Sequence, residues 1–219
     1  MRTVLSPAAA ADLIPDGASM MVGGFMGVGS PHRIIAALVA RNARDLTIIA
    51  NDTARPGVGI GKLITAGCVA KVVVSHIGTN PETQRLMLAD ELQVELVPQG
   101  TLAERIRAGG AGLGGVLTAT GLGTLAGEGQ QVVHVDGHDY LVASALRAGF
   151  ALVAARSPDY GRNLVYSLTA RNFNPLIAMA ADTVIAEANE MTIGGAPSDF
   201  WDEAFMAIVA VTLFIDSTH

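Results

Sequence analysis

The chain has 219 residues, of which 50% are hydrophobic and 16% are charged, and its formal net charge is −6. This length and apolar content suffice to bury the core of one domain, so we expect a single domain over residues 1–219. The 14 Lys and Arg residues are scattered, which argues against nucleic acid or a membrane surface as partner and favours a small-molecule ligand.

Cysteine and histidine usage narrows the class of protein further. Cys68 is the single cysteine, which excludes an internal disulfide framework and a multi-cysteine metal site, and we interpret it as a small core residue. The reducing cytoplasm is therefore the expected compartment. The five histidines are dispersed without metal-ligand spacing, so no metal is expected. The longest apolar stretch, near residues 205–215, is too short to span a bilayer.

Apolar periodicity predicts alternating helices and strands along the first half of the chain. The expected helices cover residues 7–14, 32–41, 61–67, 81–89 and 101–108. The expected strands cover residues 19–22, 46–50, 69–75 and 92–97. Strands that alternate with helices at this spacing imply βαβ crossovers. The sequence therefore predicts an α/β fold with a mostly parallel sheet, covered by helices on both faces.

The pattern changes after Gly109. The glycine-dense stretch as far as Gly129 has no usable period, and we interpret it as a long functional loop. Two short strands, residues 131–135 and 140–142, are joined across Asp136-Gly137, a pair typical of tight hairpins. A β-rich excursion is thus expected around residues 110–145. Beyond it we expect strands at residues 148–155, 165–167 and 183–186 and a helix at 174–181.

A glycine loop follows the first strand of the predicted sheet, and Pro31 opens the next helix. The loop consists of Gly23, Gly24, Phe25, Met26, Gly27, Val28 and Gly29. Backbone N–H groups beside a helix N-terminus suit an anion or a pyrophosphate. Two other interpretations stay open: a tight turn without a ligand, and a dinucleotide site. For the latter the glycine spacing differs from G-x-G-x-x-G, although Asp52 follows the second strand.

Two side-chain amides stand just beyond expected strand ends. Asn51 and Gln99 each follow a predicted parallel strand, and ligands bind at the carboxyl edge of such sheets. An amide there could donate a hydrogen bond to a developing oxyanion, as acyl transfer requires. Thr101 and Glu104 have the spacing of a capping box, which does not need Gln99. His76 also follows a strand, but a structural role is the more frequent one for such a histidine, and we leave it unassigned.

No motif of a complete catalytic site is visible. The chain has no nucleophile elbow and no Walker loop. Each candidate carboxylate is more simply interpreted as a solvated helix or turn residue; these are Glu82, Glu91, Glu95, Glu104 and Glu128. The chain by itself is therefore expected to be catalytically incomplete.

Five stretches resemble the alpha subunits of family I coenzyme A transferases. The most specific runs from Asp16-Gly17 through Met20-Met21-Val22 and Gly23-Gly24-Phe25 to Gly29 and Pro31. The others are residues 49–53, 76–82, 98–115 and 170–176. Within the family, the loop and residues 112–115 are most similar to alpha subunits of acetate or acetoacetate CoA-transferases. The resemblance covers roughly residues 1–187, and the segment beyond Glu187 departs from the family pattern.

This resemblance implies a ping-pong exchange of CoA between an acyl-CoA and a free carboxylate, through a glutamyl-CoA thioester. It places the glutamate on a beta subunit, in a Ser-Glu-Asn-Gly setting that this chain lacks. It also implies CoA binding at residues 23–29, an amide near the thioester oxyanion at Asn51, and an active-site glutamine at Gln99. An α2β2 assembly is expected, with CoA as substrate and no permanently bound cofactor. A non-catalytic acyl-CoA or sugar-phosphate binding protein stays open as the alternative.

Overall fold

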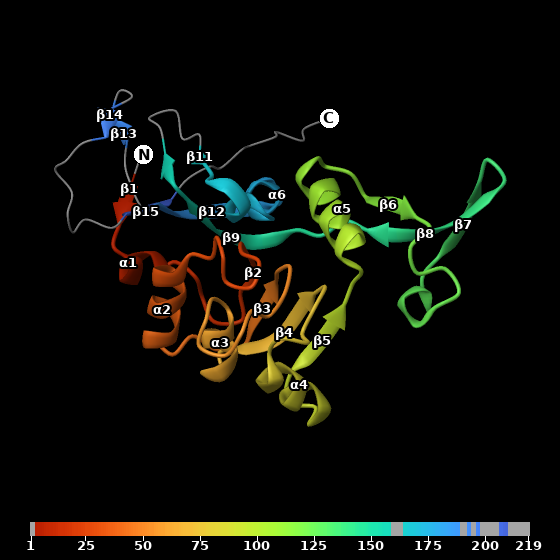
Figure 1. Ribbon diagram of the computed structural model, residues 1–219, viewed down its shortest axis with the longest axis horizontal. Coiled ribbons are helices and arrows are strands. Elements are labelled where there is room, and N and C mark those ends of the chain that lie inside the picture. Colours follow the sequence, from red (N-terminus) through yellow and green to blue (C-terminus); the bar gives the residue numbers. More distant parts are fainter. Residues whose placement is uncertain (1–2, 159–163, 189–191, 194–195, 198–205, 210–219) are drawn as a thin grey trace.

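The structure is a computed structural model that describes residues 3–158, 164–188, 192–193, 196–197 and 206–209 (Figure 1). Its central sheet has eight strands in the order β1-β15-β12-β9-β2-β3-β4-β5. Their bounds are β1 Thr3–Leu5, β2 Ser19–Val22, β3 Leu46–Ile49, β4 Val69–Val74, β5 Gln93–Leu96, β9 Ala148–Ala155, β12 Ala181–Ala188 and β15 Met206–Val209. The strands from β12 to β5 are parallel, whereas β15 runs antiparallel to both β1 and β12. The predicted mostly parallel sheet is confirmed.

Helices cover both faces of this sheet. On one side lie α1 Pro7–Ala11, α2 His32–Ala40, α3 Gly61–Thr65 and α4 Pro81–Leu88. Figure 1 shows α5 Gln99–Gly110 and α6 Asn174–Met179 on the side opposite to α2, α3 and α4. The core is accordingly divided, because successive strand residues point to opposite faces: Met20 packs in the first cluster and Met21 in the second.

The start of α5 differs from the prediction. The helix begins at Gln99, with Pro98 as its N-cap and no side-chain capping bond, so the expected capping box is wrong. Thr101 lies inside the first turn, and its buried hydroxyl has no hydrogen-bond partner among the described residues. Glu104 instead forms an ion pair with Arg107. The first N–H groups of a helix need no intrahelical acceptor, which lets the helix start directly after Pro98. Gln99 is thereby held on a helix rather than on a loop.

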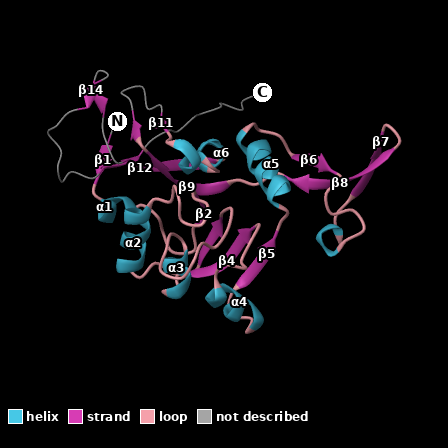
Figure 2. Cartoon of the chain, in the orientation of Figure 1, coloured by secondary structure: helices cyan, strands magenta, loops and turns pink. Residues whose placement is uncertain are grey.

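The β-rich excursion is confirmed as a separate antiparallel sheet, in the order β6-β8-β7. Its strands are β6 Gly115–Thr118, β7 Val132–Val135 and β8 His138–Ser144, and a short 3-10 helix, Leu125–Gly127, precedes β7. Asp136 and Gly137 form the predicted two-residue turn, with φ of 49° and 79° as a tight hairpin requires. The strand β6 was not predicted, because it lies in the glycine-dense stretch without period. Figure 2 shows these strands extending away from the central sheet.

Two smaller strand pairs complete the description. The strand predicted at residues 165–167 is instead β11 Leu164–Val165, which pairs with β10 Ser157–Pro158 outside the central sheet. The strands β13 Thr192–Ile193 and β14 Ala196–Pro197 form the other pair. Most of the C-terminal segment that departs from the family pattern lies outside the described residues.

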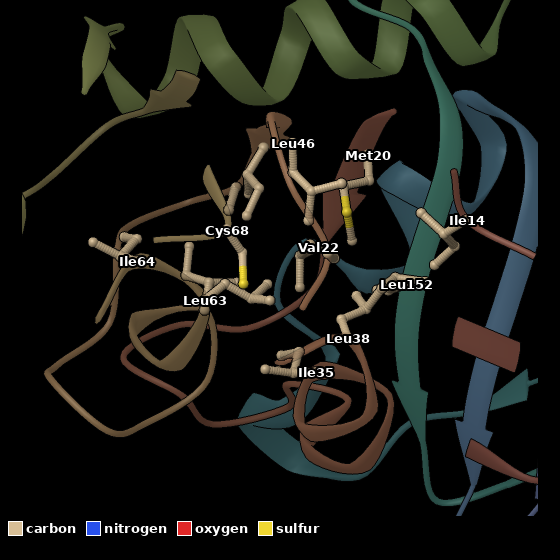
Figure 3. Close-up of a cluster of buried hydrophobic side chains, with 14 of the residues drawn as sticks. Ile14, Met20, Val22, Ile35, Leu38, Leu46, Leu63, Ile64, Cys68 and Leu152 are labelled. Carbon is tan, nitrogen blue, oxygen red and sulfur yellow. The ribbon is translucent and has the colours of Figure 1, made fainter. Parts of the chain in front are cut away.

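Cys68 occupies the first core cluster, where Figure 3 shows its sulfur among apolar side chains, with Leu63 close by. The side chain is 2% exposed, and burial raises the pKa of its thiol. Because the thiolate is the reactive form, we expect the native protein to resist alkylation by iodoacetamide at pH 8 and to react once unfolded in guanidinium chloride. Mass spectrometry of the intact chain measures the label, and rapid labelling of the native protein would contradict the placement.

Candidate active site

Two of the predicted site residues, Asn51 and Gln99, meet at the carboxyl edge of the sheet, where Ser75 joins them. Asn51 lies two residues beyond β3, Ser75 directly follows β4, and Gln99 opens the helix that follows β5. These three strands are neighbours and parallel, so their carboxyl ends share one edge. The two amides that the sequence singled out separately are thus brought into contact, although β4 lies between the strands β3 and β5 that they follow.

A chain of hydrogen bonds links these residues. Gln99 Nε2 donates to Asn51 Oδ1 at 2.6 Å, and Asn51 Nδ2 donates to Asp52 Oδ2 at 2.8 Å. Ser75 Oγ donates to the backbone oxygen of Asn51 at 2.7 Å. Asn51 is 1% exposed, whereas Gln99 is exposed. Gln99 therefore presents an amide at the surface, and the buried Asn51 orients that amide by accepting its hydrogen bond.

This arrangement can donate hydrogen bonds to an anionic oxygen. An amide nitrogen carries two hydrogens, and within the described part of the chain each of these two nitrogens has one acceptor. The second N–H of Gln99 is available to a ligand at the sheet edge. Such preorganised donors stabilise the oxyanion that forms when a nucleophile adds to a thioester carbonyl.

The glycine loop next to this site is held as a tight turn. Phe25 and Val28 exchange two backbone hydrogen bonds, of 3.0 and 2.9 Å. The residues between them, Met26 and Gly27, have φ of 53° and 88°, the left-handed region that such a two-residue turn requires. The Met26 N–H donates to Asp52 Oδ2 at 2.9 Å. Phe25 and Val28 are about half exposed, so the turn presents two apolar side chains outward.

The anion site expected at the following helix is occupied by the protein itself. The N–H groups of Arg33 and Ile34, in the first turn of α2, donate to Glu187 Oε2 at 2.9 and 3.1 Å. A carboxylate at the positive end of the helix dipole fills the place that a phosphate would take. These two N–H groups are therefore already engaged by Glu187, at the far end of β12, a contact that the sequence does not indicate.

Two asparagines of the stretch 170–176 hold the glycine loop from its other side. Asn172 accepts from the Gly24 N–H at 3.1 Å and donates to the Val28 carbonyl at 2.9 Å. Asn174 is fully buried and donates to the Gly29 carbonyl at 3.0 Å. The sequence singled out this stretch only by resemblance, since no local pattern connects segments about 145 residues apart.

Three of the glutamates considered from the sequence are engaged in structural contacts. Burial alone would raise the pKa of Glu95, but hydrogen bonds from Arg105 and Lys71 outweigh it and hold that pKa below its usual value. Glu82 and Glu91 both form ion pairs with Arg85, as solvated surface residues do. Glu82 and Glu91 match the interpretation as solvated residues, whereas Glu95 does not, because it lies on β5 and pairs with Lys71 and Arg105.

Asp52 faces the interior and accepts three hydrogen bonds, from Met26, Asn51 and the Ala54 N–H. A carboxylate that is engaged in this way is not presented to a ribose, which removes the support for a dinucleotide site. The His76 side chain is exposed, while its backbone oxygen accepts from the Thr53 N–H at 3.2 Å.

A cavity of about 420 Å³ adjoins the glycine loop, within the size range of small-molecule sites. It is lined by Gly29, Ser30, His32, Ala154, Ala155, Arg156, Ser167, Ala170 and Glu187.

In the described ranges, no three His, Cys, Asp or Glu side chains gather as a metal site would need. The same part of the chain contains no helix long and apolar enough to cross a membrane.

Comparisons with known proteins indicate the family to which the chain is similar. The family model described as coenzyme A transferase matches residues 4–199. The chain is 56% identical over 180 residues to the acetate CoA-transferase subunit alpha of Escherichia coli K12, with 82% of each chain covered. It is 51% identical over 176 residues to the acetoacetyl-CoA:acetate/butyrate CoA transferase alpha subunit of Clostridium acetobutylicum, covering 80% of this chain and 81% of that one.

A solved structure gives the same fold. An acyl-CoA transferase of Escherichia coli O157:H7, determined as a thioester complex with CoA, matches with a TM-score of 0.76 at 23% identity, over 89% of this chain and 46% of that one. The family model spans nearly the whole described chain, and close relatives align over four fifths of it. The chain therefore belongs to the coenzyme A transferase family.

Proposed function

We propose that this chain is the alpha subunit of a heteromeric CoA-transferase that moves CoA between a short-chain acyl-CoA and acetate or a 3-oxoacid such as acetoacetate. The observation that carries the proposal is the Gln99–Asn51 amide pair at the sheet edge, where the adjacent carboxylate, Asp52, already accepts three hydrogen bonds from the protein. The names of the two relatives, acetate CoA-transferase and acetoacetyl-CoA:acetate/butyrate CoA transferase, support the choice of acids.

In this proposal the nucleophile comes from the partner chain. A glutamate carboxylate of the beta subunit carries the CoA as a glutamyl-CoA thioester, and the amides of Gln99 and Asn51 stabilise the oxyanions that form as the acyl groups exchange. Both amides are donors to charge that develops only during the reaction, so they raise the rate more than the affinity.

The glycine loop is the proposed CoA-binding segment, from Gly23 to Gly29. The exposed side chains of Phe25 and Val28 offer an apolar surface for the chain of the CoA arm, and the turn holds them beside the amide pair. The N–H groups of the loop are largely engaged within the protein, so side-chain contact is the proposed mode of binding. CoA is bound as a substrate, with no permanently bound cofactor.

We further infer an α2β2 assembly, with residues 1–219 as one domain of each alpha subunit. The alpha-subunit names of the relatives support a beta partner, and the two core clusters share one central sheet, which supports one domain. A cytoplasmic location agrees with a single, buried, unpaired cysteine.

The test is an assay of acetoacetate-dependent CoA transfer from acetyl-CoA, with this chain alone and after mixing with a candidate beta subunit. We expect activity only in the mixture, because in this proposal the attacking carboxylate belongs to the partner chain. Transfer by the chain alone would contradict the division of labour, and a chain that binds acyl-CoA alone but never supports transfer would favour the binding-protein alternative.

A second measurement locates the nucleophile. After incubation with acyl-CoA, borohydride reduces a glutamyl-CoA thioester and leaves a mass change on that glutamate. We expect mass spectrometry to find this change on a glutamate of the partner chain. Modification of any glutamate of this chain would contradict the proposal.

A further inference from the structure

We propose that Asp52 is a positioning residue of this site: its carboxylate sets the direction of the Asn51–Gln99 amide pair and holds the glycine loop against it. This inference rests on the proposed CoA-transferase function, because it deepens the account of the same site. Asp52 lies just beyond β3 and both of its oxygens accept hydrogen bonds from the protein, so it acts through its neighbours rather than on a substrate.

The two carboxylate oxygens of Asp52 have different tasks. Oδ1 accepts from the Ala54 N–H at 2.7 Å, a local turn that many aspartates make. Oδ2 accepts from Asn51 Nδ2 at 2.8 Å and from the Met26 N–H at 2.9 Å, and Met26 is 26 residues away in the chain. The local turn needs only the first oxygen. The second oxygen therefore connects two parts of the site.

The direction of both amides follows from this acceptor. A carboxylate oxygen accepts hydrogen bonds and cannot donate them when ionised, so the nitrogen of Asn51 must face Asp52. Asn51 Oδ1 then faces Gln99, whose nitrogen donates to it at 2.6 Å. If the Asn51 amide were turned over, oxygen would face oxygen at Asp52 and nitrogen would face nitrogen at Gln99. Asp52 thus determines that the amide nitrogen of Gln99, rather than its oxygen, faces Asn51.

The same oxygen stabilises an unfavourable turn. Met26 adopts φ of 53°, a left-handed conformation that costs energy for a residue other than glycine. If the Asp52 carboxylate were removed, the Met26 N–H would lose its hydrogen-bond acceptor. Because one oxygen serves both Met26 and Asn51, a displacement of the loop is coupled to the amide pair.

The first test compares substitutions of Asp52 in the complex with the beta subunit. Asp52→Ala should lower kcat roughly tenfold to a hundredfold, the range for a lost hydrogen bond to a charged group. Asp52→Asn keeps the size and one acceptor oxygen, so the loss should be smaller. Asp182→Asn is the matched control, because Asp182 is an exposed residue near the amino end of β12 that pairs with Arg147, and its kcat should equal that of the wild type.

A double-mutant cycle separates positioning from a general loss of structure. If Asp52 acts on the rate partly through Asn51, then Asp52→Ala should lower kcat by a clearly smaller factor in the Asn51→Ala background, where only its effect on the glycine loop remains, than in the wild type. Effects that multiply independently would overturn this part of the proposal, as would wild-type kcat in Asp52→Ala. Absence of transfer by the wild-type complex would instead count against the proposed function.

Hydrogen exchange tests the loop without any need for turnover. Peptides that cover residues 23–29 should exchange faster in Asp52→Ala than in the wild-type protein, because the Met26 N–H loses its acceptor. The Asp182→Asn control should exchange as the wild type does. Equal exchange in all three proteins would overturn the claim that the carboxylate holds the loop.

Discussion

Gln99→Ala should lower kcat of the assembled enzyme roughly tenfold to a thousandfold, the range for removal of one donor to a developing oxyanion. The exposed amide of Gln99 is held at 2.6 Å from Asn51 and needs no rearrangement when charge appears. Asn51→Ala should lower kcat within the same range, and its loss also removes the acceptor that orients Gln99. The apparent KM for acyl-CoA should change little, because these donors act mainly in the transition state.

Gln93→Ala is the matched control for this prediction. Gln93 carries the same amide on an exposed side chain, but it opens β5 and so lies at the opposite end of the strand that leads to Gln99. Its kcat should equal that of the wild type. The measurement is the steady-state rate of CoA transfer at a saturating concentration of the acceptor carboxylic acid, compared between the variants and the wild type. If Gln99→Ala and Asn51→Ala both kept wild-type kcat, the amide pair would be removed from the reaction.

The sheet and the position of the site could be predicted because both depend on local pattern. Buried parallel strands form short apolar runs, and the polar residue after each run then lies at the carboxyl edge. Asn51 and Gln99 satisfy this rule, and the structure brings them into contact. Their roles in catalysis came from the resemblance and remain predictions.

Contacts between distant segments could not be predicted from local pattern. Glu187 accepts from the first turn of α2 across more than 150 residues, and Asn172 bonds to the glycine loop across a similar distance. Nothing in the spacing near either residue indicates such a partner. The start of α5 shows a different difficulty: Thr101 and Glu104 have the capping-box spacing, yet the helix begins earlier, after Pro98.

Gly23→Ala should cause the largest loss of stability near the site. A Cβ at Gly23 would lie 1.9 Å from Asn174 Oδ1, so one of the two must move. Asn174 cannot move freely, because its oxygen accepts from the Ala154 N–H and its nitrogen donates to the carbonyls of Gly29 and Ala170. Overpacking and lost buried hydrogen bonds together should cost about 3 kcal/mol of the free energy of unfolding.

That loss should lower Tm by roughly 6 to 12 °C in a chain of this size, as measured by differential scanning calorimetry. Gly114→Ala is the control, because Gly114 is exposed and a Cβ there meets nothing within 4 Å; its Tm should stay near that of the wild type. CoA transfer by Gly23→Ala, assayed well below its Tm, should also fall at least about tenfold, since the displaced asparagine no longer holds the loop. A Tm and a rate equal to those of Gly114→Ala would show that the loop does not depend on the contact between Gly23 and Asn174.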